Sequence, residues 1–248
     1  NIPELMTLFK EVADIKTSKM LDLPVPKLKG GDYKTIVAPK SDELGEFVDK
    51  LAERSEIIKN GCDPRIDNML LVTNDGRKAA LDLRMIDPNM PDLPNSKINM
   101  AVENIYRIWL ENKEDRLTQL VFCDLSTPRT DGTFNVYDDI KDKLVARGVP
   151  EEEIEFIHNA KTNPQKLKLF EDMRNGTKRI LIGSTSKMGA GMNVQDKLVA
   201  LHHLDCPWRP SDIEQREGRI LRQGNQNEEV EIYRYVTEGS FDAYSYQL

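Results

Sequence analysis

The chain has 248 residues, with 42 acidic and 35 basic side chains and a formal net charge of −7. Hydrophobic residues make up 39% and charged residues 31%, which is typical of a folded globular protein of one or two domains and excludes a mainly disordered chain. No apolar run approaches the roughly 20 residues that span a bilayer, which excludes a transmembrane helix, and the acidic total argues against a tail-type DNA binder covered in positive charge.

The first part of the chain predicts a mainly helical adjunct. The expected helices span 4–16, 64–73 and 75–86, with a further helix between Ser41 and Asn60-Gly61. The residues between the first helix and Ser41 predict an extended linker over 21–32 and a short strand over 33–39. Three prolines within 87–95 mark a boundary, so we predict a lobe-linking segment and helical adjunct over 1–95 and a second domain over 96–248.

From Ser96 onwards, apolar strands alternate with amphipathic helices. The expected strands span 117–123, 154–158, 179–183, 198–204 and 230–236. The expected helices span 98–112, 136–147, 163–175 and 212–222, with Asn163 capping the third and a Ser211 to Glu214 capping box opening the fourth. This alternation predicts an α/β fold with a doubly wound, mostly parallel sheet. The chain opens without Met and closes on the first turn of a helix, so we expect a piece of a longer polypeptide.

Positive charge is concentrated between Lys161 and Lys187, where seven basic and two acidic side chains give +5. Such a run is usually a solvated face. It leads directly into a glycine-containing loop over 188–193, so a basic track toward that loop is the alternative. The three cysteines, Cys62, Cys123 and Cys206, form no CxxC pair, which predicts neither a zinc site nor a disulfide framework and favours a reduced, cytoplasmic setting.

The strongest motif is Gln-x-x-Gly-Arg-x-x-Arg-x-Gly, from Gln215 to Gly224. In the expected helix, Gln215, Gly218, Arg219 and Arg222 would share one face. Two guanidinium groups on that face suit multidentate binding to a phosphate that carries developing charge, as an arginine finger does. The alternative is structural, with the arginines pairing with nearby acids of the same segment.

The motif follows a Ser184-Thr185 loop and a strand that leads to Asp205. This ordered set resembles motifs V and VI of superfamily 2 helicases and is most similar to the Swi/Snf-type DNA translocases. The resemblance covers about 96–245, and the stretch from Gln119 to Asp124 is similar to motif IV. The wording of these segments resembles the large DNA methylase–helicase fusion proteins of phages and conjugative elements. The implied fold is the second, C-terminal RecA-like lobe of a two-lobe motor.

The resemblance also implies roles for single residues. The catalytic group would be Arg219 and Arg222, reaching the ATP γ-phosphate, with Gln215 positioning that phosphate or its attacking water. Gly189, Gly191 and Asn193 would shape the loop that links the DNA contact to the nucleotide site. The nucleotide-binding residues would be Gly191, Asn193 and Gly218. Contacts to the DNA backbone would come from Ser184, Thr185, Lys187 and Arg209. The coupling segment would contain Asp205 and Trp208. Two departures weaken the carry-over of motif V, because Met188-Gly189 stands where the family has Gly-Gly, and Arg209 stands where it has Asn.

The sequence contains neither a P-loop nor an Asp-Glu-x-His box. We therefore expect ATP and Mg²⁺ to be held mainly by a missing N-terminal RecA-like lobe of the same polypeptide, and this fragment to be monomeric and inactive by itself. DNA would be contacted through its backbone, without sequence specificity. Two other functions stay open, a non-catalytic DNA-binding or clamp module and a nucleotide-sugar-type transferase lobe. A methylase loop at Asp87-Pro88-Asn89-Met90 is disfavoured, since it lacks the aromatic residue.

Overall fold

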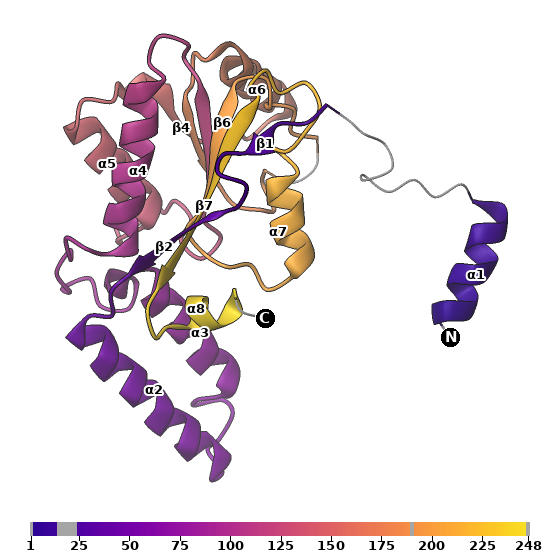
Figure 1. Cartoon of the computed structure of the whole chain (residues 1–248). Helices are drawn as coiled ribbons and strands as arrows, with labels where there is room; N and C mark the ends of the chain where they lie inside the picture. Colours follow the sequence, from indigo (N-terminus) through magenta and orange to yellow (C-terminus); the bar gives the residue numbers. More distant parts are fainter. Residues whose placement is uncertain (1, 14–23, 189–190, 247–248) are drawn as a thin grey trace.

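The computed structural model describes residues 2–13, 24–188 and 191–246, and its centre is a seven-stranded sheet (Figure 1). The strand order is β1-β7-β6-β3-β5-β4, and β2 also pairs with β7. Every strand pair in the described ranges is parallel. The strands are β1 (Lys27–Leu28), β2 (Lys34–Ala38), β3 (Thr118–Phe122), β4 (Ile154–Phe156), β5 (Ile180–Gly183), β6 (Leu198–His203) and β7 (Glu229–Thr237).

Helices cover both faces of this sheet. The α-helices are α1 (Ile2–Val12), α2 (Asp42–Lys59), α3 (Met69–Leu81), α4 (Lys97–Glu111), α5 (Val136–Ala146), α6 (Asn163–Asn175), α7 (Pro210–Glu217) and α8 (Phe241–Ser245). Short 3-10 turns occupy Leu83–Met85, Glu151–Glu153 and Ile157–Asn159. No described helix is long and apolar enough to cross a membrane.

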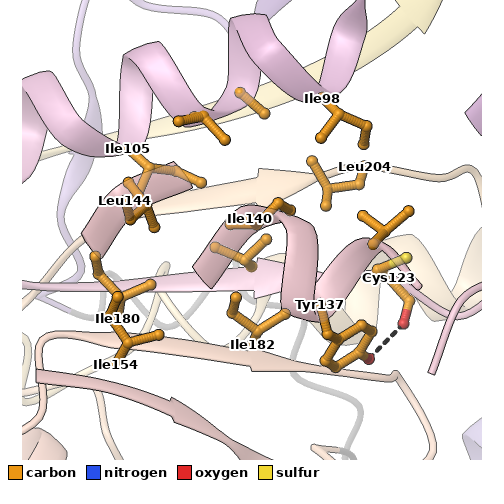
Figure 2. Packing of buried hydrophobic residues seen from close by; sticks show 14 of the residues in the cluster. Ile98, Ile105, Cys123, Tyr137, Ile140, Leu144, Ile154, Ile180, Ile182 and Leu204 are labelled. Atoms are coloured by element: carbon orange, nitrogen blue, oxygen red, sulfur yellow. Dashed lines mark hydrogen bonds between the residues drawn. The ribbon is translucent and has the colours of Figure 1, made fainter. Parts of the chain in front are cut away.

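Alternate side chains of each strand face opposite helical layers. On one face, Ile98 and Ile105 of α4 and Ile140 of α5 pack on Ile180 and Ile182 of β5 (Figure 2). On the other face, apolar side chains of α6 and of the segment after α7 pack on a second cluster. That cluster includes Leu120, Leu169, Phe170, Met173, Leu181, Leu201 and Ile220. The two layers confirm the expected α/β doubly wound, parallel sheet.

The N-terminal segment belongs partly to the same sheet. Both β1 and β2 lie beside β7, with Lys27 opposite Glu229 and Ala38 opposite Thr237. The helices that follow differ from the expected pair over 64–73 and 75–86, since a single helix α3 begins at Met69. Its start is fixed by Asn68, whose side-chain oxygen accepts from the Leu71 N–H group.

Two predicted helix caps differ from those observed. For α6, Thr162 and not Asn163 is the N-cap, because Thr162 and Gln165 form a reciprocal capping box. For α7, the helix begins at Pro210 after Arg209, so the predicted Ser211 to Glu214 capping box is wrong. The fixed φ of proline suits the first position of a helix, which moves the start of α7 two residues earlier than expected.

Candidate functional site

Polar residues follow the carboxyl ends of three neighbouring central strands. Asp124 comes just after β3, Thr185 just after β5, and Asp205 just after β6. Ligands of open parallel sheets bind at this edge. The pairing order β6-β3-β5 therefore brings these three side chains to one region of the molecule.

Arg216 of α7 connects all three, although its side chain is fully buried. Its Nη2 donates to Asp124 Oδ2 (2.8 Å) and to Asp205 Oδ1 (3.1 Å), and its Nε donates to Thr185 Oγ1 (2.7 Å). Burial works against the guanidinium charge, but the carboxylates of Asp205 and Asp124 outweigh it and raise the pKa of Arg216. Sequence reasoning did not single out Arg216. No signal in the sequence marks Arg216, because its burial and its carboxylate partners follow from the packing of the strands.

Asp205, expected in the coupling segment, is fully buried and ties two segments together. Its Oδ2 accepts from the backbone N–H groups of Asp124 (2.5 Å) and Leu125 (2.8 Å), while its Oδ1 accepts from Arg216. The loop after β3 and the helix α7 are therefore held to the same carboxylate.

The residues expected to contact DNA lie beside this network. The Thr185 N–H group donates to Asp124 Oδ1 (2.6 Å), and the Thr185 hydroxyl donates to Asp124 Oδ2 (2.8 Å). The Ser184 side chain is buried, with its Oγ 3.2 Å from Ser186 Oγ. The two hydroxyl groups expected to face DNA are thus already engaged inside the protein.

An open cleft of about 670 Å³ lies in front of these groups. Its wall includes Asp124, Thr127, His158, Ser184, Thr185, Ser186, Lys187, Asp212 and Gln215. Lys187 is exposed, and so is Arg209 at the start of α7. The wall combines one lysine and four hydroxyl groups with two carboxylates, so a ligand in this cleft would meet hydrogen-bond donors and negative charge together.

The expected single helical face of the arginine motif is wrong. Helix α7 ends at Glu217, and Gly218 is its C-cap. Beyond it the chain continues in tight turns, in which the Ile220 N–H group donates to the Glu217 carbonyl. Gln215 therefore lines the cleft from α7, whereas Arg219 and Arg222 follow the helix. A side chain at Gly218 would place its Cβ 3.1 Å from the Glu214 carbonyl, so glycine permits this close ending.

Arg219 and Arg222 face the same loop. The Nη1 atoms of both lie 3.5 Å from the Met192 carbonyl oxygen. Burial and then the charge of Arg222 lower the pKa of Arg219. Arg174 of α6 donates to the next carbonyl, that of Asn193 (2.8 Å). Guanidinium groups are donors of the kind that proteins use to bind phosphate oxygens.

The glycine-containing loop itself is partly described. Gly191 has a φ of 77°, a left-handed conformation that favours glycine. Asn193 is exposed, and the following Gln195 donates to the Gln223 carbonyl (3.3 Å), which joins this loop to the arginine motif. Gly189 lies outside the described residues.

The expected coupling residue Trp208 is 65% exposed and stacks with Arg77 of α3, whose guanidinium carbon lies 4.3 Å from the ring centroid. Arg77 also donates to the Cys206 carbonyl (2.7 Å). The segment before α7 is therefore attached to the helical adjunct as well as to the sheet edge.

The basic stretch over 161–187 does not form one continuous track. Arg179 is buried and donates to the carbonyls of Trp109 and Asn112. Lys178 pairs with Glu155 (2.9 Å), and Lys168 pairs with Asp172 (3.0 Å). Lys187 lines the cleft, so an interaction with DNA would depend on the loop after β5 and not on this stretch as a whole.

In the part of the chain that the structure describes, no group of three or more His, Cys, Asp or Glu residues is arranged to hold a metal ion. The adjacent His202 and His203 have different partners. His202 contacts Gln119 and Tyr235, whereas His203 contacts Arg216 and Glu217.

Comparisons with known proteins give the fold and the family. The crystal structure of the C-terminal part of the Fun30 ATPase domain matches with a TM-score of 0.57 and 15% identity, over 91% of this chain and 89% of that chain. "Defense against restriction protein B" of Escherichia phage P1 is 36% identical over 77 residues, which are 31% of this chain and 3% of that much longer protein. The first likeness identifies the sheet as a RecA-like lobe. The model of the helicase conserved C-terminal domain matches residues 97–224, more than half of the chain, and the chain therefore belongs to the helicase conserved C-terminal domain family.

Proposed function

We propose that this chain is the C-terminal motor lobe of an ATP-dependent DNA translocase of the Swi/Snf type in superfamily 2. In this proposal, ATP and Mg²⁺ are held mainly by an N-terminal RecA-like lobe of the same polypeptide. The observation that carries the proposal is the position of Arg219 and Arg222, whose guanidinium groups both face the Met192 carbonyl from 3.5 Å. Two guanidinium groups that face one carbonyl place two positive charges where an incoming phosphate would meet both.

The role of this lobe in hydrolysis is electrostatic. When bound, ATP supplies the phosphoanhydride whose cleavage drives the motor. Arg219 and Arg222 stabilise negative charge on the terminal phosphoryl group, and Gln215 orients the phosphate or the water. Burial is the larger cause of the lowered pKa of Arg219, and the positive charge of Arg222 is the smaller one. Arg222 acts because two like charges side by side repel each other. An incoming anion relieves that repulsion.

The role of this lobe in DNA binding is positional. Ser184, Thr185 and Lys187 line the cleft, and Arg209 directly precedes α7. Contacts of such groups with phosphates carry no sequence information, which suits a motor that moves along any DNA. Asp205 and Trp208 would couple the DNA loop to the arginine motif. The similarity to the phage P1 protein supports an origin in a large polypeptide of a phage or other mobile element.

The first prediction tests the arginine fingers in the full-length protein. Arg219→Ala and Arg222→Ala should each lower DNA-stimulated ATP turnover by at least about a hundredfold, because each removes charge stabilisation from the transition state. Binding of a fluorescent ATP analogue should change by less than about threefold, since the missing lobe holds most of the nucleotide. The measurements are steady-state ATPase with and without DNA, and nucleotide binding by anisotropy.

Arg65→Ala is the matched control, because Arg65 is an exposed arginine in the connection between α2 and α3. Its turnover should equal that of the wild type. Unchanged turnover in both finger variants would contradict the proposal, and loss of ATP binding would make these arginines structural. Wild-type DNA binding without any ATP turnover would favour the clamp module instead.

A further inference from the structure

The carboxylate of Asp124 is surrounded by the kinds of donors that bind a phosphate. It accepts from a backbone N–H group (2.6 Å) and a hydroxyl group (2.8 Å), both of Thr185, and from the guanidinium of Arg216 (2.8 Å). A backbone amide, a hydroxyl and an arginine are a donor set that proteins use for phosphate oxygens. Every donor that Thr185 could offer to a DNA backbone is therefore occupied by an anion of the protein itself.

This carboxylate lies where a ligand can replace it. The Asp124 side chain is 30% exposed and forms part of the cleft wall, beside Lys187 and Gln215. An anion that enters the cleft therefore meets the same donors.

Arg216 is prepared for such an exchange. Removing the only carboxylate partner of a buried arginine strongly lowers the stability of the folded protein. Arg216 has a second carboxylate partner, Asp205, whose Oδ1 accepts from Arg216 at 3.1 Å. The Asp205 side chain is fully buried, so a ligand in the cleft does not compete for it. Displacement of Asp124 therefore leaves the buried guanidinium paired.

We propose that Arg216 together with the amide and hydroxyl groups of Thr185 forms a binding site for a DNA backbone phosphate, and that Asp124 occupies this site when DNA is absent. The inference rests on the proposed contact between Thr185 and DNA and adds two residues to it. Arg216 is a ligand of the phosphate, and Asp124 is its intramolecular competitor. Because Arg216 belongs to α7, the same exchange reaches the helix that carries Gln215 and precedes Arg219.

The test measures binding of the full-length protein to a labelled DNA duplex of arbitrary sequence, without nucleotide. Asp124→Asn has nearly the same shape but no charge, so it competes less well for Thr185 and Arg216. Its dissociation constant should fall about fivefold or more, equivalent to roughly 1 kcal/mol. Adding Thr185→Val should remove most of that gain, because the hydroxyl group that Asp124 releases is then missing.

Asp212→Asn is the matched control. Asp212 lines the same cleft, and its removal changes the cleft charge by the same amount, but the contacts of Thr185 do not include it. Its dissociation constant should fall clearly less than that of Asp124→Asn, because it removes a nearby charge without releasing a donor. Equal gains in the two variants would reduce the effect to cleft charge and overturn the inference, as would an unchanged or weakened affinity in Asp124→Asn.

Thermal unfolding of each variant separates affinity from folding. If Asp124→Asn does not fold, Asp124→Ser is used with the same expected gain and the same contradicting outcomes. Absence of DNA binding in the wild type would end both the proposed function and this inference. DNA-stimulated ATPase in the wild type, combined with no gain in the Asp124 variants, would end the inference alone.

Discussion

The hydrogen-bond partners of His202 determine its protonation. Its Nε2 lies 3.0 Å from Gln119 Oε1, which can only accept, so Nε2 carries the proton and Nδ1 accepts from the Tyr235 hydroxyl (3.0 Å). Complete burial lowers the pKa of His202 to about 3. The neutral ring is thus a fixed part of the core, as expected for a packed histidine and not for a metal ligand.

This histidine should make folding stability depend on pH. Below its ordinary pKa of about 6.5, His202 binds a proton in the unfolded chain but not in the folded one, so stability falls as the pH drops from 6.5 toward 3. Between about pH 7 and pH 5 the loss attributable to His202 is about 2 kcal/mol. Urea unfolding of the wild type and of His202→Gln at both pH values measures it. The variant should show the smaller difference, and an equal difference would contradict the assignment.

At this scale, the sequence identified the residues of a linear motif but not their partners. Arg219 and Arg222 stand out because their spacing is visible along the chain. Arg216 is their immediate neighbour and looks like an ordinary surface arginine in the sequence. Its role depends on Asp124, which lies 92 residues away, and on Thr185, 31 residues away. Contacts at such separations follow from the packing of strands, which spacing does not reveal.

Single side chains determine where the helices begin. The predicted span of α6 matches the observed one, but its N-cap was predicted one residue too late. The reason is that Thr162 and Asn163 are both good capping residues, and only the reciprocal contact with Gln165 distinguishes them. The same limit affected α7, where Pro210 and Gly218 shortened the helix and separated the arginines from Gln215.

The capping assignment of α6 leads to a direct comparison. Thr162→Ala should lower the free energy of unfolding by about 1 kcal/mol, because the Gln165 N–H group loses its acceptor. Asn163→Ala should change it by less than about 0.5 kcal/mol, since Asn163 is inside the first turn. Urea unfolding of both variants measures the two values. The reverse order would show that the sequence-based choice of Asn163 was correct.

Contacts between the N-terminal and C-terminal parts of the chain complete the fold. Strand β7 pairs with β1 and β2 from the N-terminal segment and with β6. Helix α8 then packs on α3, where a Cβ added at Gly76 would lie 2.7 Å from the Phe241 ring. The alternation of strands and helices predicted the parallel sheet. It could not predict that residues near 27–38 complete the sheet beside β7, because that pairing joins segments about 200 residues apart.

A buried ion pair also joins distant segments, between Lys97, the first residue of α4, and Asp242 of α8. Asp242→Leu leaves the Lys97 ammonium buried without its carboxylate, and should lower the free energy of unfolding by about 3 kcal/mol or more. Adding Lys97→Met should recover at least about half of that loss, since a buried pair can be replaced by apolar groups more cheaply than it can be broken.

Chemical denaturation of the single and double variants measures this coupling. Lys59→Met is the control, because its pair with Glu56 is exposed and should contribute less than about 0.5 kcal/mol. A double variant as unstable as Asp242→Leu would mean that α8 is held by its apolar contacts with α3 and not by the ion pair. Recovery would mean that Asp242 is needed mainly because Lys97 is buried. The buried charge at the start of α4 then depends on α8 for its partner.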